Sequence, residues 1–97
     1  MTQENSALMI QIAQLYPSMP MARAAIMIRM ASQDGPVLQK SLQDELGITP
    51  DQTLRHCQAL EDMEIIVHSH HQGRSNFWKL GPVGETLKKT LSVPSAA

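Results

Sequence analysis

The sequence predicts a small, mostly helical α+β fold in which two helices joined by a tight turn are followed by a β-hairpin. Three observations support this prediction. Apolar residues recur at helical spacing in five separate segments. Gly47 and Pro50 mark a connection of only three residues between two of those segments. Beyond residue 64, a β-branched run and an aromatic run flank a turn-forming stretch at 72–76.

The size and charge of the chain limit what it can do. A chain of 97 residues fits one small domain with a single core. The formal net charge of −1 excludes a general polycation, so nucleic-acid binding has to come from a local cluster of basic side chains. Acidic residues are absent from 65–82, and basic or imidazole side chains gather between residues 55 and 79. They are Arg55, His56, His68, His70, His71, Arg74 and Lys79.

The single Cys57 cannot form an intramolecular disulfide, and no apolar run approaches the length of a membrane span. No secretory signal is present. We therefore expect a cytoplasmic location and no membrane partner.

The segment 1–17 predicts a helix capped by Asn5 or Ser6 and ended by Pro17. Its apolar stripe is broad for a helix at the edge of a small domain. Two interpretations remain open: a second subunit covers the stripe, or the stripe packs on its own domain. With two residues of the last helix, it forms the expected dimerisation surface: Leu8, Ile12, Leu15, Tyr16, Leu87 and Leu91.

The next segment predicts a central scaffold helix, capped by Ser18, with only Arg23 and Arg29 clearly solvated. The turn residues 34–36 end it. Val37 and Leu38 then form a very short strand or an extended entry into a short helix. Along that helix Leu38, Leu42 and Leu46 recur four residues apart, and Gly47 provides a left-handed cap.

A second helix of the pair is predicted at about 49–63, with Thr49 as N-cap and Pro50 at the first helical position. One side places Thr53, Cys57 and Leu60 toward a core. The opposite side carries groups that form hydrogen bonds: Asp51, Gln52, Arg55 and Gln58. So short a connection makes the two helices cross steeply as a helix-turn-helix, and this helix is the expected recognition helix.

A β-hairpin is predicted at about 65–80, with Arg74 near its tip. Gly81 and Pro82 then open a last helix, before a frayed tail at 93–97. The expected organisation is an N-terminal helix at 1–17, a central domain at 18–81, and a C-terminal helix and tail at 82–97.

Three stretches carry a resemblance to a known family: LQDELGITPDQTLRHCQALEDMEII, HHQGRSNFWKL and WKLGPVGETL. In this order they resemble the turn, recognition helix, wing and return strand of bacterial winged helix-turn-helix proteins, particularly MarR-type and ArsR-type regulators. The resemblance covers about 19–91. It implies a winged helix-turn-helix fold with extra N-terminal and C-terminal helices. Three positions depart from the family pattern: Gln43 replaces an Ala, Glu64 a Gly and Gly81 a Thr.

The resemblance implies a homodimeric transcriptional regulator that binds double-stranded DNA. In the expected contacts, Arg55 pairs with guanine O6 and N7, Gln52 with adenine N6 and N7, and Arg74 with the minor groove or its phosphates. The candidate DNA-binding residues are Lys40, Thr49, Asp51, Gln52, Arg55, His71, Gln72, Arg74 and Ser75.

Two other classes compete with this interpretation. One is a winged-helix module that binds proteins and not DNA. The other is a metal or redox sensor, because strand alternation places His68 and His70 on one face, near His56 and Cys57. Two imidazoles lack a third ligand, and Cys57 lies on an apolar helix side. We expect no enzyme activity and no cofactor, and the sequence identifies no small-molecule effector.

Overall fold

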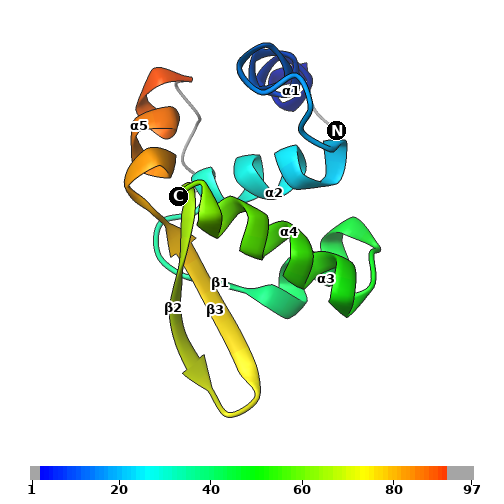
Figure 1. The fold of residues 1–97 in the computed structure, drawn as a ribbon, viewed down its shortest axis with the longest axis vertical. Coiled ribbons are helices and arrows are strands. Elements are labelled where there is room, and N and C mark those ends of the chain that lie inside the picture. Colours follow the sequence, from blue (N-terminus) through cyan, green and yellow to red (C-terminus); the bar gives the residue numbers. More distant parts are fainter. Residues whose placement is uncertain (1–2, 92–97) are drawn as a thin grey trace.

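The protein forms five helices and one small antiparallel sheet, as its computed structural model shows for residues 3–91, with side chains described from Ala7 onward (Figure 1). The sheet order is β1-β3-β2, and the β2–β3 hairpin extends away from the helices. This architecture confirms the predicted mostly helical α+β, winged helix-turn-helix fold. The elements are α1 (Gln3–Leu15), α2 (Met21–Ala31), β1 (Val37–Leu38), α3 (Gln39–Leu46), α4 (Pro50–Asp62), β2 (Ile66–Gln72), β3 (Ser75–Leu80) and α5 (Pro82–Thr90).

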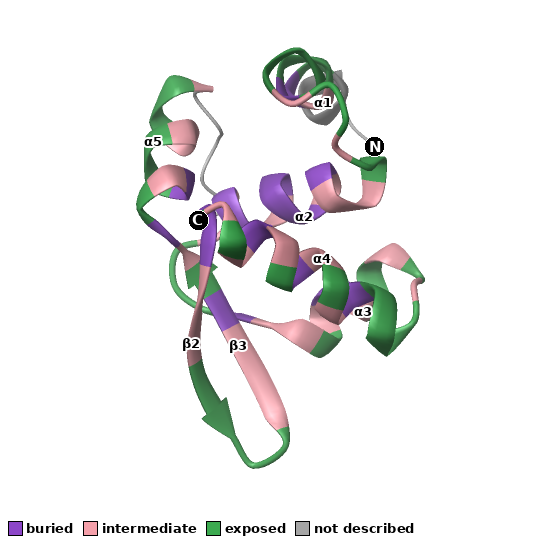
Figure 2. Cartoon of the chain, viewed as in Figure 1, coloured by how far each residue is buried: buried purple, intermediate pink, exposed green. Residues whose placement is uncertain are grey.

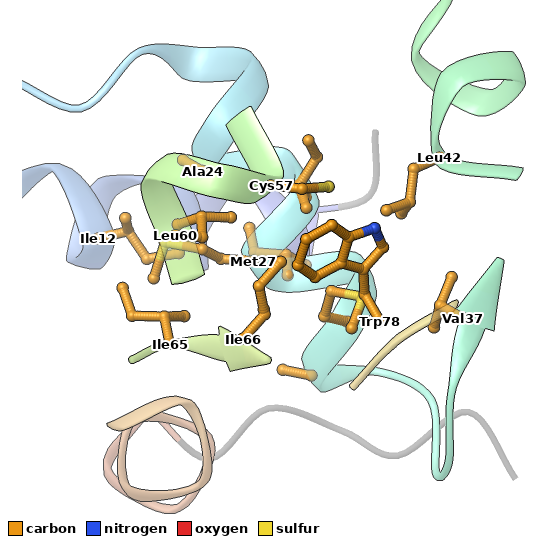
Figure 3. Close-up of a cluster of buried hydrophobic side chains, with 14 of the residues drawn as sticks. Ile12, Ala24, Met27, Val37, Leu42, Cys57, Leu60, Ile65, Ile66 and Trp78 are labelled. Atoms are coloured by element: carbon orange, nitrogen blue, oxygen red, sulfur yellow. The ribbon is translucent and has the colours of Figure 1, made fainter. Parts of the chain in front are cut away.

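Helix α2 is the centre of the molecule, as the sequence predicts, because α1, α3, α4, α5 and β3 all pack against it. Six of its eleven residues are buried. Figure 3 shows how side chains from the other elements close around it, with the indole of Trp78 lying between the helices and the sheet. The fully buried members include Ile12, Ile26, Met30, Leu42, Cys57, Leu60, Ile65 and Ile66.

The starts of the first two helices differ from the prediction. Helix α1 is helical from Gln3, so a cap at Asn5 or Ser6 is wrong. Helix α2 begins at Met21, with Pro20 as N-cap and no capping side chain, so Ser18 does not cap it. Met19 precedes Pro20, and a residue before proline disfavours the helical backbone conformation. The helix therefore begins only after Pro20. The tail at 93–97 lies outside the described residues.

The junction between α4, β2 and α5 depends on two glycines and one unusual glutamate. Glu64 has a φ of 60°, so it takes the left-handed conformation that normally favours glycine. A Cβ on Gly81 would lie 2.5 Å from the carbonyl oxygen of Glu64, and one on Gly84 would lie 2.0 Å from that of Ile65. Only glycine therefore lets α5 approach the start of β2 this closely.

Candidate nucleic-acid interface

Helix α4 begins with a capping box that the sequence only half predicts. The Thr49 hydroxyl accepts the Gln52 backbone N–H at 3.1 Å, and the Gln52 side-chain oxygen accepts the Thr49 N–H at 3.0 Å. Pro50 occupies the first turn, where no amide donor is required. The reciprocal pair of bonds fixes where α4 starts and holds the Gln52 side chain against the helix end.

The two sides of α4 divide as predicted. Thr53, Cys57 and Leu60 are fully buried. The candidate contacts Asp51, Gln52 and Arg55 are exposed, as is Gln58, and the outer surface of α4 is coloured accordingly in Figure 2. Arg55 has no ion pair among the described residues. Its guanidinium is therefore free for an external acceptor.

The hairpin forms a wing whose tip is solvent-exposed. Gly73 turns the chain with a φ of 63°, and Arg74 follows it at the tip. The candidate contacts His71 and Gln72 are exposed on β2, and Ser75 opens β3 partly buried. Arg74, like Arg55, has no ion pair among the described residues.

The wing is tied to the helix-turn-helix by one tryptophan. Trp78 is 3% exposed, pairs with Val37 of β1, and donates its indole N–H to the Gln39 side-chain oxygen at 2.8 Å. Since Gln39 begins α3, this bond fixes the wing against the helix pair. The wing and α4 therefore hold a defined spatial relationship.

A β-bulge in the wing overturns the predicted arrangement of its histidines. The register shifts between His68, which pairs with Trp78, and His70, which pairs with Phe77. Adjacent residues of β3 point to opposite faces, so His68 and His70 do as well. The prediction that they share a face is wrong. His70 instead stacks on Phe77 with ring centroids 4.5 Å apart, while His68 lies 4.4 Å from His71.

Metal and redox chemistry gain no support from the remaining candidates. Among the described residues no cluster of three or more His, Cys, Asp or Glu side chains could hold a metal ion. Burial, and secondarily the negative charge of Glu61, raises the pKa of the Cys57 thiol to about 12. A thiol held in its protonated form is a poor nucleophile, so Cys57 serves as a packing residue.

Two polar groups flank the site. Lys40 is exposed on α3, 3.5 Å from Asp44 one turn away, and so weak a surface pair leaves the ammonium available to a phosphate. Arg23 donates its Nε–H to Nδ1 of His56 at 3.2 Å, joining α2 to the inner edge of α4. Burial, and next the positive charge of Arg23, lowers the pKa of His56.

The predicted dimerisation residues separate into two groups. Leu8 and Ile12 are buried in the chain's own core, and Tyr16, Leu87 and Leu91 pack partly buried against it. Leu15 alone is exposed, at 52%. Two further apolar residues, Ile10 and Met21, were not predicted as surface residues and are 60% and 75% exposed. The sequence signal that could have identified Ile10 is its position outside the apolar stripe of α1 that faces the core.

A winged helix-turn-helix protein is the class that these elements define: a tight helix pair, an outward-facing second helix and a fixed wing. No family model matches the chain, and no curated protein matches it. Several solved structures, however, match the fold of this chain. Rv1404 from Mycobacterium tuberculosis has 21% identity and a TM-score of 0.73, over 91% of this chain and 62% of its own.

Structures from both expected families are among the neighbours. ZitR from Lactococcus lactis, a zinc-responsive MarR family member, has 15% identity and a TM-score of 0.62 over 87% of this chain and 68% of its own. The ArsR family regulator RHA00566 has 20% identity and a TM-score of 0.55, over 93% of this chain and 84% of its own. The chain spans only 51% of a second ZitR chain.

The described residues include no helix with the length and apolar character required to cross a bilayer.

Proposed function

We propose that the protein is a sequence-specific, double-stranded-DNA-binding transcriptional regulator that acts as a homodimer. The observation that carries the proposal is the exposed outer side of α4, whose Arg55 has no ion pair among the described residues, together with the wing that carries Arg74. The fold shared with regulators supports it.

In the proposed complex, the first turns of α4 enter the major groove, where base edges differ most between base pairs. Arg55 donates both hydrogen bonds to guanine O6 and N7. Arg74 contacts the minor groove or its phosphates, and Lys40 contacts a phosphate. The Trp78–Gln39 bond matters here because a fixed wing lets both contacts form together without a further loss of entropy.

A salt titration of duplex binding tests the proposal. Each neutralised phosphate should contribute a slope of about −0.9 in log affinity against log salt. We expect Arg55→Ala to lose about 1–3 kcal/mol of discrimination between sequences, and Arg74→Ala to weaken all sequences similarly and to reduce the salt slope by about one.

Lys89→Ala is the matched control, because Lys89 is exposed on α5 and its loss removes the same charge. If Arg55→Ala and Arg74→Ala bind as the control does, the placement of the site is wrong. If no duplex binds the unmodified protein even at low salt, the chain is a winged-helix module for a protein partner instead.

A further inference from the structure

The side chain of Gln52 is held in one orientation by the start of its own helix. Its oxygen lies 3.0 Å from the backbone nitrogen of Thr49, while its own backbone N–H donates to the Thr49 hydroxyl at 3.1 Å. A backbone N–H only donates, so the amide atom facing Thr49 has to be the oxygen. The amide is therefore not free to rotate between its two hydrogen-bonding ends without breaking the capping box.

The nitrogen of the same amide is left for an external partner. Gln52 is exposed, and no acceptor for its side-chain NH2 group is found among the described residues. We propose that Gln52 reads DNA as a hydrogen-bond donor only, and that it selects a base that presents acceptors in the major groove. The inference rests on the proposed function and assigns a base class to one residue of that interface.

The inference replaces the adenine contact that residue type alone suggests. A bidentate contact with adenine requires the glutamine oxygen to accept from N6 while the nitrogen donates to N7. In this structure one lone pair of the oxygen already accepts from Thr49, which turns the oxygen toward the helix end, so an adenine contact would require the same oxygen to serve the helix end and the base edge at once. Guanine presents two acceptors, N7 and O6, to the two hydrogens of the amide nitrogen. Guanine should thus be preferred over adenine, and cytosine, whose N4 amino group is a donor, should be rejected.

Gln52→Glu provides a selective test because glutamate also completes a capping box. One carboxylate oxygen still accepts the Thr49 N–H, so helix α4 and the thermal stability should be preserved. The other oxygen is an acceptor where the amide had a donor. Glutamate accepts from cytosine N4, so the preferred base should change from guanine to cytosine at one position of each half-site.

The experiment selects bound fragments from random duplexes with the unmodified protein, Gln52→Glu, Gln52→Ala and Gln11→Glu. Gln11→Glu is the control, since Gln11 is exposed on α1, away from α4 and the wing, and gains the same charge. We expect Gln52→Glu to change the preference at its position by roughly 5- to 150-fold. Gln52→Ala should lose the preference there and melt at a lower temperature, and Gln11→Glu should retain the guanine.

The outcomes separate this inference from the proposed function. If the unmodified protein selects no duplex, the function itself fails. If it selects duplexes but has adenine where Gln52→Glu alters the preference, the donor-only reading is overturned. It is equally overturned if Gln52→Glu and Gln52→Ala both select the unmodified sequence, or if Gln52→Glu binds nothing while Gln11→Glu binds normally.

Discussion

Among the charged residues of the candidate interface, Arg55 and Arg74 have no ion pair with a described residue, and Lys40 has only the weak pair with Asp44. Ion pairs join Arg29 to Glu45 at 2.9 Å and Lys88 to Asp34 at 3.3 Å, and both lie outside the outer side of α4 and the wing tip. Surface pairs of this kind contribute at most about 1 kcal/mol each. These pairs therefore matter less for stability than for where positive charge remains unpaired. Although the net charge of the chain is −1, the guanidinium of Arg55 stays free for an anionic partner.

The contact between Arg23 and His56 predicts a pH-dependent stability. Nδ1 of His56 accepts a hydrogen bond from Arg23, which a proton on Nδ1 would abolish. Burial and then the Arg23 charge lower the pKa of His56 in the folded state, so the unfolded chain binds the proton more readily. This contribution to stability is complete above the unfolded pKa of about 6.5 and is lost as the pH falls below it.

Urea denaturation of the unmodified protein and of His56→Gln between pH 5 and 7.5 measures this effect. The decline in free energy of unfolding toward pH 5 should be smaller in His56→Gln. His70→Gln, on the exposed part of the wing, is the control and should keep the full decline. An equal pH dependence in the unmodified protein and His56→Gln would exclude His56 as its source.

Glu64 predicts a stabilising substitution. Its φ of 60° places a side chain in the left-handed region, which costs about 1–2 kcal/mol. Glycine removes that cost but loses more backbone entropy on folding. We expect Glu64→Gly to raise the free energy of unfolding by about 0.5–1 kcal/mol. Asp62→Gly, inside the last turn of α4, should instead lower it by about 1 kcal/mol, as chemical denaturation would show.

At the scale of the elements, local chemistry made most boundaries predictable. Thr49 and Pro50 fix the start of α4, and Gly47 ends α3 with a φ of 64°, because caps and left-handed turns are written in neighbouring residues. The exposed candidates on α4 follow from the helical period in the same way. The exposed site residues were therefore largely accessible from the sequence.

The features that the sequence did not predict depend on contacts between distant segments of the chain. Nothing in the order of residues 66–72 shows that a bulge at Ser69 would separate His68 from His70, since register is set by the strand opposite. The capping box adds a second case: Thr49 was expected as a cap, but the orientation that it imposes on the Gln52 amide required coordinates. For Leu8 and Ile12 the sequence left open a contact with a second subunit or with the chain's own core, and coordinates were needed to place them in the core.

Gly84 gives a direct test of how α5 packs. An added Cβ would lie 2.0 Å from the carbonyl oxygen of Ile65, a backbone atom that cannot move aside alone. Gly84→Ala should lower the free energy of unfolding by about 1–3 kcal/mol, since α5 has to shift outward. Glu85→Ala, on the exposed side of the same turn, should stay within about 0.5 kcal/mol. Equal denaturation midpoints for both variants would show that α5 is not held against β2.

At the scale of the whole molecule, apolar side chains are exposed to solvent at the edge of the hydrophobic core. Ile10 and Met21 are more than half exposed at the edge of a groove of about 420 Å³ between α1 and α2. Leu15 is exposed at the C-terminal end of α1. Exposed apolar surface of this kind favours association, and a two-fold pairing of identical chains is the commonest form. It also suits a DNA site with two half-sites about 34 Å apart.

The proposed homodimer predicts two linked losses in Ile10→Glu and Met21→Glu. Burying a carboxylate at the contact disfavours association, so sedimentation equilibrium should show a dimer dissociation constant raised at least about tenfold. Binding to a duplex with two half-sites should weaken with it, while binding to a single half-site should remain, because α4 and the wing are untouched. Gln11→Glu places the same charge on an exposed polar position of α1 and should leave both measurements unchanged. A dimer that survives both substitutions would have to form through another surface, and the spacing of its two recognition helices would then be set by that surface instead.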